Sequence, residues 1–182
     1  MKRITSALLA LGVLTGVSTT AFAADADVPA DTYAAMGFYL RGDAGWSWLN
    51  YSGPDDSAFA VGGGVGYQYN EYLRADLRAD WAGNFNKGAS DTAVSTVTGN
   101  MYLDIPTGSM ITPYLGAGLG YGWAIDDVGP DKEGFAFALM AGASVDLSES
   151  LSADVGYRYR EIMDNGQNPR EHQVLMGLRY KF

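Results

Sequence analysis

The 182-residue sequence predicts an all-β fold, an eight-stranded antiparallel transmembrane up-and-down β-barrel. Apolar and polar side chains alternate with a period of two through eight stretches of about ten residues, the length of a tilted membrane-spanning strand. Short turns and longer polar segments join these stretches alternately, which is the arrangement found in barrels that cross a membrane. Aromatic residues collect near both ends of the stretches, where amphipathic rings prefer to lie at membrane interfaces.

Residues 1–23 are expected to be a cleaved secretory signal peptide. Lys2 and Arg3 give a positive start, an apolar stretch follows, and Ala21-Phe22-Ala23 fits the small-residue cleavage pattern. A transmembrane anchor is the alternative, and the shortness of the apolar run disfavours it. Residues 24–36 are expected to form a periplasmic N-terminal tail, which leaves residues 37–182 for the barrel domain.

The composition excludes several classes of protein. The chain has 12 Lys+Arg and 21 Asp+Glu, and loss of the two basic residues in the signal peptide leaves 10 against 21, a net charge of about −11. A nucleic-acid interface needs clustered basic residues, so no nucleic acid is expected as a partner. The absence of cysteine excludes disulfides and thiolate metal sites. No later apolar run reaches the roughly 20 residues of a membrane helix, so a membrane crossing has to use strands.

The expected strands follow one another from residue 38 to the C-terminus. Their ranges are 38–48, 59–69, 73–81, 96–105, 113–123, 135–147, 151–160 and 173–182. The third is the clearest, because apolar residues from Leu73 to Trp81 alternate with two arginines and two aspartates. Residues 70–71, 106–110 and 148–150 are expected to be short periplasmic turns. Residues 49–57, 82–92, 124–134 and 161–171 are expected to be four longer extracellular loops.

The fifth expected strand carries glycine at every second position, at Gly116, Gly118, Gly120 and Gly122. A phosphate-binding loop has unequal glycine spacing, because a turn must lead into a helix. A period of two indicates a strand whose inward face has almost no side chains. We interpret these glycines as a packing device that leaves room in a narrow barrel for large inward side chains such as Tyr102, Tyr114 and the arginines.

Two sets of aromatic residues mark the ends of the expected strands. Trp46, Trp48, Trp81 and Trp123 all fall at the long-loop ends and are expected to form an aromatic belt. At the other ends lie Phe38, Tyr67, Tyr69, Tyr180 and Phe182. A soluble ligand-binding barrel is disfavoured, because its outward apolar stripes would be exposed to water.

The polar register of the strands is expected to face the lumen and to form an interior ion-pair network. Its members are Arg41, Asp43, Arg74, Asp76, Arg78, Asp80, Asp104, Asp146, Asp154, Arg158, Arg160, Arg179 and Lys181. The opposite charges nearly balance, and a buried charge without a partner is very costly. Eight strands leave an interior only wide enough for side chains to fill. An acid–base pair of Asp76 and Asp80 is the alternative, but the arginines beside them favour structural ion pairing.

Nothing in the sequence supports catalysis or a cofactor. The one histidine, His172, is expected to point outward, whereas Ser47 on the neighbouring strand is expected to point inward. We therefore assign no catalytic residue, cofactor or metal site and do not expect an enzyme. The expected loops are acidic and contain Asp55, Asp56, Asp126, Asp127, Asp131, Glu133, Glu161 and Asp164. Solvated loops are the expectation, and cations shared with lipopolysaccharide phosphates are a hypothesis.

Short motifs carry a resemblance to a known family. Leu178, Tyr180 and Phe182 alternate up to a terminal phenylalanine, which resembles the signal read by the outer-membrane barrel assembly machinery. Residues 99–104 and 112–121 are similar to the opacity-protein-like, or outer-membrane immunogenic, proteins of Gram-negative bacteria. The resemblance covers residues 37–182 and implies an eight-stranded barrel in the Gram-negative outer membrane. Members of the family are structural or immunogenic, adhere to host cells, bind haem or form small pores.

The sequence therefore favours a non-enzymatic outer-membrane protein with a structural and surface-exposed role, in envelope integrity, as a surface antigen or in adhesion through its loops. The alternative is a narrow porin-like channel for ions or very small solutes. The expected partners are outer-membrane lipid, lipopolysaccharide, the barrel assembly machinery and a host or environmental ligand at the loops. The protein is expected to be a monomer.

Overall fold

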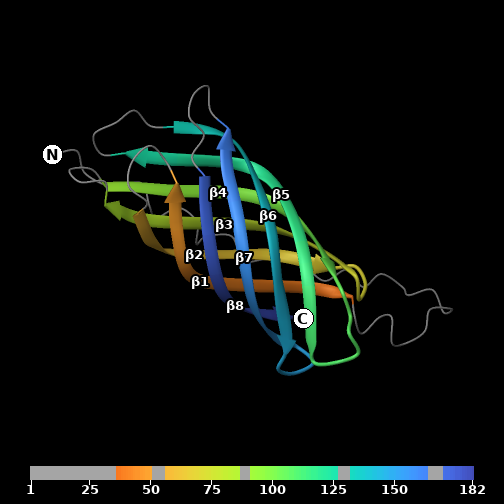
Figure 1. Cartoon of the computed structure of the whole chain (residues 1–182). Coiled ribbons are helices and arrows are strands. Elements are labelled where there is room, and N and C mark those ends of the chain that lie inside the picture. The colour runs from red at the N-terminus through yellow and green to blue at the C-terminus, as the bar shows by residue number, and fades with distance from the viewer. Residues whose placement is uncertain (1–35, 51–55, 87–90, 127–131, 164–169) are drawn as a thin grey trace.

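The computed structural model describes residues 36–50, 56–86, 91–126, 132–163 and 170–182, which form eight strands. The strands are β1 (Gly37–Asn50), β2 (Asp56–Gln68), β3 (Leu73–Asn86), β4 (Asp91–Asp104), β5 (Ile111–Asp126), β6 (Lys132–Asp146), β7 (Leu151–Met163) and β8 (Arg170–Lys181). They close into one antiparallel barrel in sequence order, with β8 paired to β1 (Figure 1). This confirms the predicted fold class and topology. Within the described residues, no helix is long and apolar enough to cross a membrane.

The strands are longer than the alternation predicted, with 12 residues in β8 and 16 in β5. Glu161 and Glu171, predicted to lie in a loop, belong to β7 and β8 and have strand partners there. Asp56, Asp126 and Glu133 also lie in strands rather than loops. The prediction was wrong here because ladder hydrogen bonds need no particular side chain, so pairing continues where the alternation fades. The predicted signal peptide, residues 24–35 of the predicted tail, and Asp55, Asp127, Asp131 and Asp164 lie outside the described residues.

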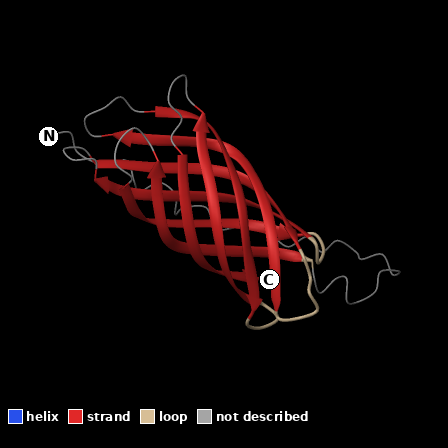
Figure 2. Ribbon diagram, in the orientation of Figure 1, coloured by secondary structure: helices blue, strands red, loops and turns tan. Residues whose placement is uncertain are grey.

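The described turns all lie at one end of the barrel, which we call the short-turn end (Figure 2). In the β2–β3 turn, the Asn70 side-chain oxygen accepts hydrogen bonds from the backbone amides of Tyr72 and Leu73, at 2.9 and 2.8 Å. Asparagine favours such turns because its side chain can replace a backbone acceptor. In the β4–β5 turn, Gly108 has a φ of 70°, a conformation that glycine adopts without strain. We call the opposite end of the barrel the long-loop end.

The outer wall is apolar and the lumen is polar. Large side chains such as Leu77, Leu119 and Met176 are 58, 60 and 65 % exposed on the outer wall. Inward-facing arginines such as Arg74 and Arg158 are fully buried. A chain in water would bury its apolar side instead, so this inverted pattern fits a barrel surrounded by lipid.

The glycines of β5 allow its neighbours to pack closely. A Cβ at Gly120 would lie 2.7 Å from the Cα of Thr98 on β4, and a Cβ at Gly116 would lie 2.7 Å from the Tyr102 ring. A Cβ at Gly122 would lie 2.7 Å from Ile162 Cδ1 on β7. These contacts agree with a packing role, because the space that glycine leaves is already filled.

Candidate functional site in the barrel lumen

The lumen contains three regions with different chemistry. We call the open region at the short-turn end the vestibule. Next lies the charged layer, which consists of Arg41, Asp43, Arg74, Asp76, Arg78, Asp80, Asp104, Asp154, Arg158 and Arg179. Nearer the long-loop end lies the apolar plug, which consists of Ala58, Ala60, Ala82, Val94, Ala136, Ile162 and Leu175.

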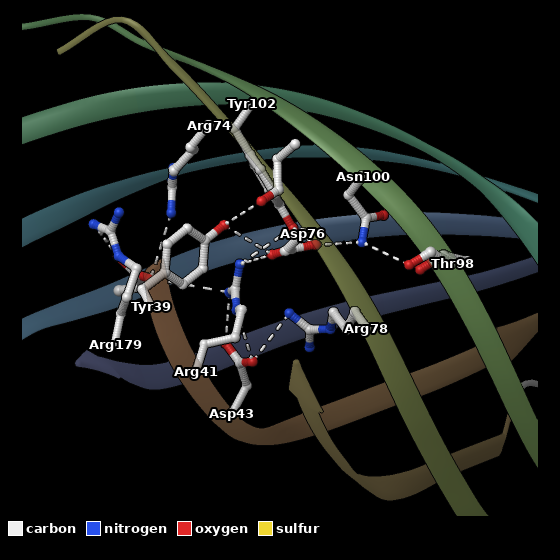
Figure 3. A network of polar contacts seen from close by, with 12 residues as sticks. Tyr39, Arg41, Asp43, Arg74, Asp76, Arg78, Thr98, Asn100, Tyr102 and Arg179 are labelled. Atoms are coloured by element: carbon white, nitrogen blue, oxygen red, sulfur yellow. Dashed lines mark hydrogen bonds and ion pairs between the residues drawn. The ribbon is translucent and has the colours of Figure 1, made fainter. Parts of the chain in front are cut away.

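Arg41 links three strands within the charged layer (Figure 3). Its Nη2 lies 2.8 Å from Asp43 Oδ1 on β1, and its Nη1 lies 3.2 Å from Asp76 Oδ2 on β3. The same Nη1 donates to the Tyr102 hydroxyl on β4 at 3.1 Å. Asp76 also accepts a hydrogen bond of 2.7 Å from the Asn100 side chain. One guanidinium therefore joins β1 to strands across the lumen.

Arg158 on β7 reaches the opposite wall of the barrel. Its Nη1 lies 2.5 Å from Asp80 Oδ2 on β3, and its Nη2 donates to Thr98 Oγ1 on β4 at 2.9 Å. Asp80 is shared with Arg78, whose Nε lies 2.6 Å away. Arg78 Nη1 also lies 3.0 Å from Asp43 Oδ2, which connects this cluster to Arg41. These contacts cross the full width of the lumen.

Arg74 occupies an aromatic cage. Its guanidinium carbon lies 4.5 Å from the centre of the Tyr102 ring and 4.8 Å from that of Tyr114. Its Nε donates to Asp104 Oδ1 at 3.0 Å. A Cβ at Gly142 would lie 2.6 Å from Tyr114, so this glycine is needed for the ring to lie in the lumen. Cation–π contacts are strongest where the cation has lost its water, as it has here.

A separate cluster surrounds Glu171 nearer the long-loop end. Arg160 Nε donates to Glu171 Oε2 at 2.9 Å, and Arg160 also bonds the hydroxyl of Thr96 on β4. Ser47 Oγ and Gln173 Nε2 donate to Glu171 Oε1 at 2.5 and 2.8 Å. Sequence reasoning missed Glu171. The signal was present, because Glu171 continues the inward period of two that contains Gln173 and Arg179.

The vestibule is a cavity of about 480 Å³ at the short-turn end. Arg179 crosses its inner end, where Nη1 donates to Gln68 on β2 and Nη2 to Ser144 on β6, each at 3.2 Å. Asp154 lies 3.5 Å from Nη2 and balances the charge. Between the vestibule and the apolar plug, the cavity in the charged layer has a volume of only about 10 Å³.

Two residues of the predicted network lie elsewhere. Asp146 is exposed at the mouth of the vestibule, where it accepts a hydrogen bond of 2.7 Å from Ser152 rather than pairing with a described arginine. Lys181 is half-buried and also lines the vestibule. Both belong to the inward register, but they lie at the end of the barrel where water reaches them. The other predicted members are buried in the lumen.

The structure separates the residues of the catalytic alternative. Ser47 is fully buried in the lumen and bonded to Glu171. His172 lies on the outer wall, where its Nδ1 is 2.5 Å from the Tyr157 hydroxyl. A nucleophile and its base must lie within hydrogen-bond distance of each other. Among the described residues, no group of three or more histidines and carboxylates is arranged to hold a metal ion.

The aromatic residues of the predicted belt lie on the outer wall. Trp46, Trp48, Trp81 and Trp123 are 48, 41, 40 and 36 % exposed, each on the half of its strand nearer the long-loop end. At the short-turn end, Phe38 packs edge-on against Tyr67 with ring centres 4.9 Å apart. Leu178, Tyr180 and Phe182 also face outward near this end. Their role as an assembly signal stays a prediction.

Comparison with known proteins assigns the chain to a family whose fold agrees with the barrel described above. Residues 9–182 match the family described as outer membrane protein beta-barrel domain. An uncharacterized protein of Brucella suis biovar 1 is 33 % identical over 235 aligned positions, which cover 89 % of this chain and 82 % of that protein. The crystal structure of Neisserial surface protein A superposes with a TM-score of 0.73 at 27 % identity, covering 80 % of this chain and 97 % of the other.

A second solved structure shares the fold at lower identity. The attachment invasion locus protein of Yersinia pestis superposes with a TM-score of 0.56 at 15 % identity. The superposition covers 81 % of this chain and 99 % of the other. Both structures are small barrels, and their agreement with this chain supports the eight-stranded assignment.

Proposed function

Because the chain belongs to the outer membrane protein beta-barrel domain family, we propose that it is a non-enzymatic protein of the Gram-negative outer membrane with a structural and surface-exposed role. The barrel stabilises the envelope by spanning the outer membrane, and its long-loop end faces the outside. Lipopolysaccharide and outer-membrane lipid are its immediate partners. A host or environmental ligand binds at the loops, and no step of chemistry is required.

The observation that carries this proposal is the filled lumen. Arg158 connects β7 to the opposite strand β3, and Arg41 connects β1 to β3, through buried contacts of 2.5 and 3.2 Å. The residual cavity of about 10 Å³ beside them has room for about one water molecule. A solute could pass only if several buried ion pairs separated, and each would then leave a charge without a partner.

The relatives support the surface role. Neisserial surface protein A is, by its name, a surface protein, and it is the structural relative with the higher identity of the two described above. The separation of Ser47 from His172 supports the non-enzymatic part of the proposal. The inward-facing glycines support a closed barrel, because Tyr102, Asn100 and Ile162 already occupy the space beside them.

A narrow channel is the second candidate. The observation that favours it is the vestibule, which already opens about 480 Å³ of the lumen at one end. For conduction, the charged layer would have to rearrange around Arg158 and Arg41. The two candidates therefore differ in one property, the permeability of the charged layer.

Single-channel conductance across a planar bilayer tests the proposal. We expect no discrete openings from protein whose folding is verified by heat-sensitive gel mobility. The matched control is the Arg158→Ala variant, which removes the contact between β7 and β3 and should raise the frequency of openings. Reproducible openings of the unaltered protein, with ion selectivity changed by Arg158→Ala, would overturn the structural role in favour of the channel.

A further inference from the structure

We propose that the outer wall near the long-loop end carries a binding site for the phosphate groups of lipid A, the membrane anchor of lipopolysaccharide. We call this site the Arg170 cluster, and its members are Tyr157, Tyr159 and Glu161 on β7 and Arg170 and His172 on β8. Such a site requires the long-loop end to face the outer leaflet, so it rests on the proposed function and deepens it by naming the residues that contact the lipid.

Arg170 is an exposed cation on a wall that is otherwise apolar. Its side chain is 60 % exposed, and it belongs to the same outward row of β8 as His172 and Val174. Among the lysines and arginines whose side chains the structure describes, it is the one exposed on the outer wall. The other described arginines are buried in the lumen, and Lys181 lines the vestibule. A guanidinium suits phosphate, because its planar fork can donate two parallel hydrogen bonds.

Glu161 fixes the position of this guanidinium. It lies in the outward row of β7, where a lipid-facing carboxylate is costly unless it is paired, and its side chain is only 11 % exposed. Arg170 Nε lies 3.5 Å from Glu161 Oε2, and the Tyr159 hydroxyl donates to the same oxygen at 2.6 Å. The carboxylate is therefore covered while the guanidinium is not, so a ligand that arrives from outside the barrel meets the positive charge first.

His172 adds a second donor on the same outward row. It lies two residues along β8 from Arg170, a separation of about 7 Å in a strand. The Tyr157 hydroxyl lies 2.5 Å from His172 Nδ1, and the centre of the Tyr159 ring lies 5.3 Å from that of the imidazole. These two neighbours fix the plane of the imidazole. With the Tyr157 hydroxyl donating to Nδ1, the imidazole carries its proton on Nε2, which is then a donor for phosphate.

The tryptophan belt sets the depth of the cluster in the membrane. His172 pairs with Trp48, one of the four tryptophans of the belt, and Arg170 lies two residues nearer the long-loop end. Tryptophan prefers the level of the lipid headgroups, so Arg170 lies at the outer side of that level. Lipid A carries its phosphates on the sugars of its headgroup, and its acyl chains would lie against the apolar wall below.

Nuclear magnetic resonance of the untagged protein in lipid nanodiscs tests the proposal. The chain has one histidine, so the ring Cε1–H resonance of His172 reports on the site alone. Lipid A with both phosphates is added at rising mole fraction to phosphatidylcholine, and we expect a saturable shift of this resonance. Lipid A without phosphate should bind about tenfold more weakly, which is the loss expected for one charge-assisted contact. Phosphatidylglycerol, an anionic phosphodiester, should also bind more weakly than lipid A.

Variants of Arg170 test which residue recognises the phosphate. Arg170→Gln removes the guanidinium and should abolish the difference between phosphorylated and phosphate-free lipid A. Arg170→Lys keeps a charge beside Glu161 but lacks the planar fork, so it should retain part of that difference. Val174→Ala, on the same outward row but deeper in the membrane, is the matched control and should leave the difference unchanged. Heat-sensitive gel mobility verifies that each variant is folded.

Four results would overturn the proposal. They are the absence of a saturable shift with lipid A, equal shifts from phosphorylated and phosphate-free lipid A, binding of phosphatidylglycerol as tight as that of lipid A, and an intact difference in Arg170→Gln. The first three are measured on the unaltered protein, so they do not depend on a variant that folds. Conductance tests the structural role separately, because a conducting barrel could bind lipid A and a silent one could fail to bind it.

Discussion

The two halves of the lumen use the same strands and the same inward register, yet one is closed and the other is open. In the half nearer the long-loop end, every described arginine has a carboxylate within reach, and the apolar plug fills the remaining space. At the short-turn end, carboxylates such as Asp146 and Glu149 line a cavity of about 480 Å³. The difference teaches that side-chain size and pairing, not strand number, decide whether an eight-stranded barrel is filled.

The largest effect should come from breaking the closed half. Asp80→Ala leaves Arg78 and Arg158 buried without the carboxylate they share. Removal of one partner from a buried ion pair typically costs about 3–5 kcal/mol, so we expect a loss of that size in the free energy of unfolding. Urea titration of protein refolded into lipid vesicles measures it. Asp146→Ala at the mouth is the control, and a loss equal to that of Asp80→Ala would contradict the contrast between the halves.

A smaller effect should follow from emptying the apolar plug. Ile162 is 1 % exposed and packs beside Gly122 and Gly134. Ile162→Ala removes its buried methyl groups and should lower the free energy of unfolding by about 2–4 kcal/mol. The same titration measures this change, and conductance should stay silent because the charged layer is intact. Openings in this variant would show that the plug, rather than the ion pairs, closes the lumen.

Packing between β4 and β5 should respond less strongly. In Gly120→Ala the new Cβ would lie 2.7 Å from the Cα of Thr98, so the strands must shift apart. Overpacking of this kind costs about 1–3 kcal/mol. Gly42→Ala provides the comparison, because a Cβ at that outward position meets nothing within 4 Å. Equal stability of the two variants would argue against the packing role of the β5 glycines.

The smallest effect should come from the open half. Glu149→Gln changes an exposed residue at the vestibule mouth, and surface changes of this kind are usually within about 0.5 kcal/mol. Urea titration should therefore give an unfolding curve that overlaps that of the unaltered protein. A loss comparable to that of Gly120→Ala would mean that the mouth is more tightly structured than its exposure indicates.

The alternating pattern was sufficient to predict the barrel, its topology and the direction of most inward side chains. Along β3, for example, each charged residue alternates with an apolar one, so the inward face could be read directly. The pattern failed where residues of one type occur on both faces. Ile162 and Ala82 fell in segments expected to be loops, so the pattern did not show that these apolar residues face the lumen and belong to the apolar plug.

The charge of a residue predicted its location in the barrel less well than its place in the alternating pattern did. Glu171 was predicted to be the last residue of a longer polar loop, but it is buried and bonded to Arg160. Asp146 was predicted to pair in the interior because it is charged and inward-facing, but it lies at the mouth. The alternation of residues in a strand predicts whether a side chain points into the lumen or outward. How far along the barrel axis that side chain lies depends on the stagger of neighbouring strands.

The closure of the barrel has a consequence for how the chain folds. The amide of Phe182 donates to the carbonyl of Phe38 at 3.0 Å. The first strand therefore pairs with residues at the opposite end of the chain. Until β8 arrives, β1 and β7 each present an unpaired edge that can bind another chain. Contacts between such distant segments form slowly, because the intervening chain must first be ordered. Protection of these two edges during assembly is therefore a requirement set by the topology itself.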